Sequence, residues 1–132
     1  MNDLSELAHD HCIEGSMGLI DKVVMIGRDG EIWGIAGRWK ITSEEAQVIA
    51  QQVKQPALFM ARGISLGGIK YMGLVSNEEN FQGYKHAVKG GVNGIISDKV
   101  IIIGGFSEPH QNSAAHSFMK GVCLNLLEAS KR

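Results

Sequence analysis

A pair of adjacent glycines, Gly67 and Gly68, interrupts an apolar segment and constrains how the chain can fold. The surrounding segment, GISLGGIKYM at residues 63–72, is half apolar before the pair and again after it. A two-residue hairpin turn requires positive φ angles, which glycine adopts without a Cβ clash. The segment therefore predicts two antiparallel strands joined by a tight turn, with Lys70 on the polar side of the second strand.

The size and charge of the chain limit the classes of protein to which it can belong. Its 132 residues fit one domain, residues 1–132, with a core of its own. Lysine and arginine number 13 against 14 aspartates and glutamates, so no global charge favours nucleic acid. With 44% apolar residues and 17 glycines, the composition indicates a globular, turn-rich domain.

The chain carries no recognisable catalytic, cofactor or metal signature. The glycine clusters lack the Lys-Ser or Lys-Thr ending of a phosphate-binding loop, and there is no G-x-S-x-G elbow. Cys12 and Cys123 have no metal-ligand spacing, and we expect both thiols to be reduced. Because no catalytic motif is present, we expect a protein that is not an enzyme. No signal peptide or membrane span is apparent, so we expect it to be cytosolic.

Capping and turn residues predict the elements of the first half. A helix is expected from Asp3 to Glu14, ended by Gly15. Strands at residues 19–26 and 31–36 flank the Asp-Gly turn at Asp29 and Gly30. The sequence Thr-Ser-Glu-Glu at 42–45 resembles a capping box that opens a second helix, which ends at Pro56.

The second half reads as strands followed by one helix. We expect strands at 57–66, 69–75, 81–86, 95–96 and 100–105, with a glycine turn at 89–91. The unbroken apolar run Val100–Ile103 indicates a central strand buried on both sides. The final helix, 112–130, has a predicted buried stripe of four residues: Ala115, Phe118, Val122 and Leu126. The fold class is therefore α+β, an antiparallel sheet whose terminal helices lie across one face.

Several polar and aromatic residues are candidates for binding. Trp33 follows the Asp-Gly turn and fits either core packing or ligand contact. Lys70, Lys85 and Lys89 are each explained by solvation, but on neighbouring strands they could form a basic patch. His110 and His116 flank the start of the last helix.

These motifs together resemble the profilin family over nearly the whole chain. GISLGGIKYM is similar to the segment before the fourth strand of profilins, and DGEIWGIAG to their Asp-Gly-x-x-Trp-Ala hairpin. KGGVNGIISDKVIIIGGFSEP resembles their glycine-rich turn and following strand pair, with Phe106 in a tyrosine position. The resemblance implies a sheet between terminal helices on one face and shorter helices on the other.

The resemblance also implies partners and sites. Profilins bind monomeric actin, regulate its polymerisation, bind phosphoinositides and recognise proline-rich peptides, which implies a cytoplasmic, cytoskeleton-associated protein without a cofactor. The implied phosphoinositide site is Lys85 with Lys89. The implied actin-binding residues are Lys70, Met72, Lys85, Lys89, His110, Asn112 and His116.

The poly-proline site departs from the family pattern. Proline-rich peptides dock between flat aromatic rings that also donate hydrogen bonds. The corresponding positions hold Leu4, Leu7, Trp33 and Phe118, so three of the four offer neither donor nor indole. We therefore expect weak or absent poly-proline binding.

Two other functions are compatible with the sequence. One is an interaction or adaptor domain, in scaffolding or trafficking, that shares the profilin-like fold but does not bind actin. The other is a sensor that holds a small ligand beneath the helices.

Overall fold

The protein is an antiparallel sheet with helices on both faces. The computed structural model describes residues 4–108 and 112–130. Its seven strands follow the spatial order β2-β1-β7-β6-β5-β4-β3, and each pair is antiparallel. The strands are β1 (Lys22–Gly27), β2 (Ile32–Ala36), β3 (Ile64–Leu66), β4 (Ile69–Ser76), β5 (Asn80–Lys85), β6 (Gly90–Ile96) and β7 (Val100–Ser107).

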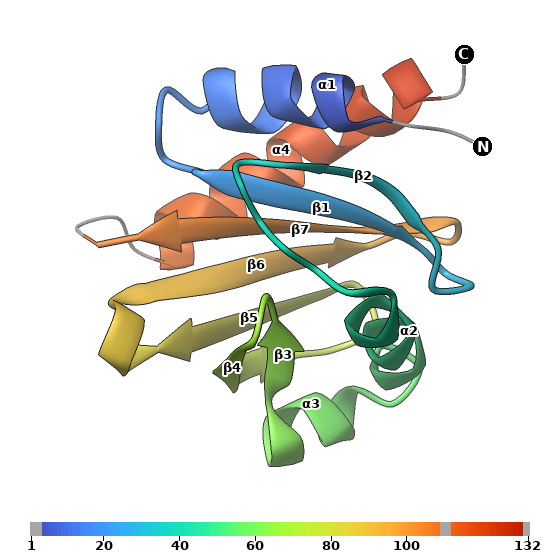
Figure 1. The fold of residues 1–132 in the computed structure, drawn as a ribbon, viewed down its shortest axis with the longest axis vertical. Coiled ribbons are helices and arrows are strands. Elements are labelled where there is room, and N and C mark those ends of the chain that lie inside the picture. Colours follow the sequence, from blue (N-terminus) through green and yellow to red (C-terminus); the bar gives the residue numbers. More distant parts are fainter. Residues whose placement is uncertain (1–3, 109–111, 131–132) are drawn as a thin grey trace.

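The helices form two layers, as expected (Figure 1). The first and last helical segments pack on one face of the sheet and the two middle helices on the other. The helical segments are α1 (Ser5–Ala8), the π-helical turn η1 (His9–Glu14), α2 (Ser43–Gln52), α3 (Pro56–Arg62), the short 3-10 helix η2 (His86–Val88) and α4 (Asn112–Ser130). The α+β class is confirmed. None of these helices is long and apolar enough to cross a membrane.

Strand β7 lies inside the sheet, between β1 and β6, and separates two hydrophobic cores. Ile101 and Ile103 point into the core beneath α2 and α3, whereas Val100, Ile102 and Phe106 point into the core beneath α1 and α4. All seven residues from Val100 to Phe106 are buried. The prediction of a central strand buried on both faces is therefore confirmed.

Both terminal helices occur where they were expected, with different details. The first changes to π-helical hydrogen bonding after Ala8, and Gly15 at its end has a φ of −62°, so no left-handed cap forms. Asp3 lies outside the described residues. The buried stripe of α4 also differs, because Phe118 and Val122 are only partly buried against the core. The buried positions are Ala115, Met119, Cys123 and Leu126.

Two predictions in the middle of the chain are wrong. Residues 57–62 are helical rather than extended, because Pro56 occupies the first turn of α3, where its fixed φ favours a helix. The turn expected at 89–91 lies at η2, and Lys89 ends it with a φ of 50°. Gly90 and Gly91 begin β6, and a Cβ on Gly91 would lie 2.6 Å from Cζ of Phe106. Ring packing, not turn geometry, requires this glycine.

The two cysteines lie in the core between the terminal helices. Cys12 is fully buried and Cys123 is 4% exposed, and both thiols are free. Burial, with a smaller contribution from the neighbouring Cys123, raises the pKa of Cys12 to about 12. The Cys12 thiol therefore stays protonated at neutral pH, where it acts as a small apolar group.

One carboxylate connects α2 to the glycine hairpin. The predicted capping box is present, since Thr42 Oγ1 accepts from the Glu45 amide and Glu45 Oε1 accepts from the Thr42 amide. The Glu45 carboxylate also accepts from the amides of Gly67, at 3.1 Å, and Gly68, at 3.0 Å. Both glycines have positive φ angles, 62° and 79°, as the hairpin prediction requires.

We predict that Glu45→Ala lowers the free energy of unfolding by about 1–3 kcal/mol, because it removes a helix cap and leaves turn amides without their acceptor. Urea unfolding followed by circular dichroism measures this change. Glu44→Ala is the matched control, because Glu44 is an exposed carboxylate in the same helical turn. Equal destabilisation by the two substitutions would contradict the role of Glu45.

Candidate functional site

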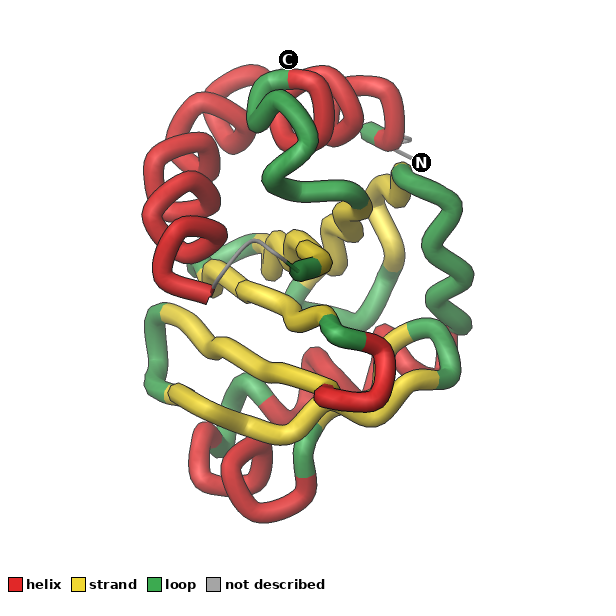
Figure 2. Tube along the Cα trace, turned by 90° about the vertical axis from the view of Figure 1, so that its left-hand side faces the viewer, coloured by secondary structure: helices red, strands yellow, loops and turns green. Residues whose placement is uncertain are grey.

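Part of the sheet face that carries the terminal helices is left open. Met72, Tyr84, Gly91 and Phe106 lie opposite one another across β4, β5, β6 and β7, so they share a face. Phe106 packs beneath α4, which places this row on the terminal-helix side. Helix α4 packs on β6 and β7, and β4 and β5 extend beyond it (Figure 2).

We call this uncovered region the open face; it consists of outward residues of β4 and β5. Met72 is 71% exposed and Val75 is 38% exposed, so the open face has an apolar character. Exposed apolar side chains of this size, side by side, are typical of protein contact surfaces. The residues of the open face are Lys70, Met72, Val75, Gln82 and Tyr84.

A buried amide fixes the start of α4 beside the open face. Asn93 lies next to Gln82 in the register and is fully buried, the single buried polar side chain within the described residues. Its Nδ2 donates to Oδ1 of Asn112, the first residue of α4, at 2.8 Å. His116 follows one helical turn later and is half-buried. Asn112 therefore borders the open face, and His116 follows it along α4.

Tyr84 connects the open face to the segment after β7. Its hydroxyl donates to a carboxylate oxygen of Glu108, and this hydrogen bond raises the pKa of Tyr84. The amide of Glu108 donates in turn to the carbonyl of Lys89, at 2.9 Å. Sequence reasoning missed Tyr84, Glu108 and Asn93, because their roles depend on pairing between distant strands.

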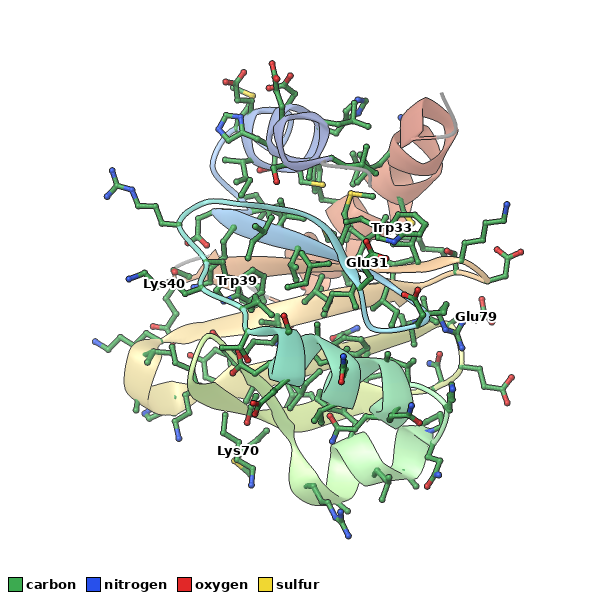
Figure 3. All side chains as sticks on the ribbon, turned by 45° about the vertical axis from the view of Figure 1, so that its right-hand side comes forward. Glu31, Trp33, Trp39, Lys40, Lys70 and Glu79 are labelled. Carbon is green, nitrogen blue, oxygen red and sulfur yellow. The ribbon has the colours of Figure 1, made fainter. Side chains whose placement is uncertain are left out.

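The three lysines predicted to form a patch are only partly brought together. Lys70 is exposed on β4 and extends away from the fold (Figure 3), and Lys85 is half-buried at the end of β5. Both line a hollow of about 310 Å³ together with Arg62 at the end of α3. Lys89 lies beyond this hollow, in the turn before β6. His110 falls outside the described residues.

Arg62 was missed because its segment was assigned to a strand. As the last residue of α3 it occupies the position where a cation interacts favourably with the helix dipole. Its guanidinium adds a third positive charge to the hollow lined by Lys70 and Lys85. Three cationic side chains therefore line this hollow, and no carboxylate is among its lining residues within the described part of the chain.

The four residues that the resemblance implied as a degenerate poly-proline site lie against one core. Leu4, Leu7, Trp33 and Phe118 are all partly buried against the cluster between the terminal helices. The Leu4 amide donates to the Trp33 carbonyl at 2.7 Å, which holds the start of the first helix on β2. Trp33 thus contributes to the core while keeping an exposed part. Leucines on this rim provide no rigid aromatic slot.

One exposed group offers potential metal ligands within the described part of the chain. His9 Nδ1 lies 3.4 Å from Oδ1 of Asp10 and 3.8 Å from Oε1 of Glu14. All three residues lie on the outer side of η1 and form ordinary surface ion pairs when His9 is protonated. We assign no metal to this group.

Comparison with known proteins identifies close relatives. The sequence profile of the profilin family matches residues 7–130. A profilin of Naegleria pringsheimi is 50% identical over 114 residues, which cover 86% of each chain. Among solved structures, Acanthamoeba castellanii profilin IA has a TM-score of 0.83 at 20% identity, covering 96% of this chain and 98% of its own. A LokiProfilin2 solved in complex with rabbit actin has a TM-score of 0.77 at 20% identity, covering 93% and 95%.

Proposed function

Because this chain belongs to the profilin family, we propose that it binds monomeric actin through the open face and thereby regulates actin polymerisation. Profilins are not enzymes, and no catalytic reaction is assigned to the chain. An actin partner would place the protein in the cytoplasm, in association with the cytoskeleton.

The observation that carries this proposal is the exposed apolar surface of β4 and β5. Met72 is flexible and polarisable, and with Val75 it forms an apolar centre suited to a protein contact. Lys70 lies at one edge of this centre, while the start of α4, with Asn112 and His116, borders it elsewhere. An interface of standard size buries about 800 Å² per partner and extends beyond such a centre. A LokiProfilin2 of the same fold was solved in complex with rabbit actin, which supports actin as the partner.

The proposed roles of the lysines differ. Lys70 belongs to the open face and acts at the rim of the actin contact. Lys85 points toward the α3 side of the sheet, and Lys89 lies in the turn that precedes β6. Contact of either lysine with actin would therefore be peripheral. His110 remains a proposed actin contact on the basis of the family resemblance alone.

We predict that Lys70→Glu slows association with actin roughly three- to tenfold at low salt, because a rim charge mainly affects encounter. The thermal midpoint should stay nearly unchanged, since Lys70 is exposed. Stopped-flow binding to the cognate actin monomer and a pyrene-actin assembly assay measure these effects. Lys54→Glu is the matched charge reversal, on the opposite side of the sheet beyond α2.

Equal association rates for Lys70→Glu and the wild type would reject the open face as the contact. If the wild-type protein leaves pyrene-actin assembly unchanged, the adaptor function without actin binding becomes the better assignment.

We also propose that anionic phosphoinositide headgroups bind near the hollow of Arg62, Lys70 and Lys85, with Lys89 contributing from the neighbouring turn. Three cations around about 310 Å³ supply the local positive charge that the overall charge of −1 does not. Each lysine near an anionic membrane surface contributes about 1 kcal/mol to binding.

For the double variant Lys85→Gln/Lys89→Gln we predict roughly thirtyfold weaker co-sedimentation with vesicles that contain phosphatidylinositol bisphosphate. Vesicles of phosphatidylcholine alone serve as the reference, and Lys54→Gln as the control variant. If the amount of protein that co-sediments does not depend on the anionic lipid content of the vesicles, this part of the proposal is rejected.

The last part of the proposal is that poly-proline binding is weak or absent. By the family resemblance, Leu4 and Leu7 stand where profilins carry an aromatic pair, and leucine supplies neither a flat face nor a donor. A proline decamer titrated into the protein, with tryptophan fluorescence as the signal, should show no saturation in the micromolar range. Micromolar affinity that is lost in Trp33→Ala would refute this prediction.

A further inference from the structure

We propose a second interaction surface, around the β2 edge of the sheet and helix α2, that binds an extended basic segment of a partner protein. The surface runs along the exposed side of α2 and the turn between β1 and β2. Two open hollows form it, with volumes of about 500 Å³ and 550 Å³, and both include Asp29 and Gln47. We call the two together the α2 groove.

The hairpin turn and α2 meet at the junction of the hollows. Gly30, in the turn, has a φ of 92°, and a Cβ there would lie 2.9 Å from Cγ of Gln47. The turn therefore rests directly on the helix, and the two hollows lie on either side of this contact. Figure 3 shows Glu31 and Trp33 above α2, and both residues line one of the two hollows.

The charge of the α2 groove is of one sign. Every charged side chain that lines either hollow, within residues 4–108 and 112–130, is a carboxylate. Asp29, Glu31 and Glu44 are exposed, and they concentrate three negative charges on a protein with a formal charge of only −1. A cluster of one sign at a concave surface attracts a partner of the opposite sign and directs its approach. The chemistry therefore selects lysine- or arginine-containing segments.

Amide side chains favour a peptide over an isolated cation. Gln47 and Gln51 are exposed on the same side of α2, one turn apart, and Gln55 follows at the turn before α3. Four helical residues advance about 6 Å, and two residues of an extended chain advance about 6.6 Å. Gln47 and Gln51 can therefore hydrogen-bond to the backbone of two residues that lie two positions apart in an extended segment.

Apolar side chains complete the site. Val48 is 54% exposed and lines one hollow with Leu58, while Trp33 lines the other and is half-buried. Such positions accept apolar side chains of the partner between its cations. An extended segment that alternates basic and β-branched residues fits the groove in charge, spacing and polarity.

The test uses a fluorescein-labelled decapeptide of alternating lysine and valine, with an alternating glutamate and valine peptide as its counterpart. Fluorescence anisotropy at about 50 mM salt measures affinity for the full chain. We expect the lysine peptide to bind, the glutamate peptide not to bind, and the side-chain amide NMR signals of Gln47 and Gln51 to shift during titration.

The variants separate charge from amide pairing. The double variant Glu31→Gln/Glu44→Gln should lower the affinity for the lysine peptide roughly fivefold and reduce the salt dependence of binding, since exposed ion pairs contribute modestly. Gln51→Ala should lower the affinity for the lysine peptide about threefold and leave the salt dependence of binding unchanged. Glu78→Gln removes one exposed carboxylate outside the groove and should have no effect. Equal binding of both peptides, or unchanged affinity in the double variant, would overturn the proposal.

Discussion

The burial of β7 on both faces is the constraint on which the rest of the structure depends. Alternate residues of this strand enter different cores, so Ile101 and Ile102 each need a helical layer above them. Burying an isoleucine side chain contributes about 1.5–3 kcal/mol, which makes both layers necessary for stability. The terminal helices cover only the strands nearest β7 on their side. The distant strands β4 and β5 consequently remain free on that face and become available to a partner.

Much of the architecture could be predicted because local chemistry determines it. The Gly67-Gly68 turn, the Thr42 to Glu45 capping box and the apolar run of β7 each specify one conformation from neighbouring residues alone. Pro56 did not specify one conformation, because proline is favoured both after the end of one helix and in the first turn of the next. Gly91 was misread for a similar reason, since a glycine required by a neighbouring aromatic ring looks like a turn glycine in the sequence.

The candidate site was predictable only where a single strand carries it. Lys70 and Met72 alternate with buried Tyr71, so their outward direction follows from the strand pattern. The direction of Lys85 did not follow, because it depends on how β5 pairs with both neighbours. Arg62 was concealed by the strand assigned to its segment, and Asn93 acts through a hydrogen bond to Asn112, 19 residues away in the chain. Family resemblance supplied Asn112 and His116, whose place beside the sheet depends on a buried amide pair.

The carboxylate of Glu45 couples the unfolding of α2 to the unfolding of the turn between β3 and β4. It holds the first turn of α2 and the β3–β4 turn, which are 22 and 23 residues apart in sequence, with one side chain. If α2 unwinds at its start or the β3–β4 turn opens, the Glu45 carboxylate moves and the other element loses its hydrogen-bond acceptor. Amide hydrogens in the two elements should therefore exchange with solvent as one cooperative unit. A single carboxylate thus couples the opening of two local structures that are separate in sequence.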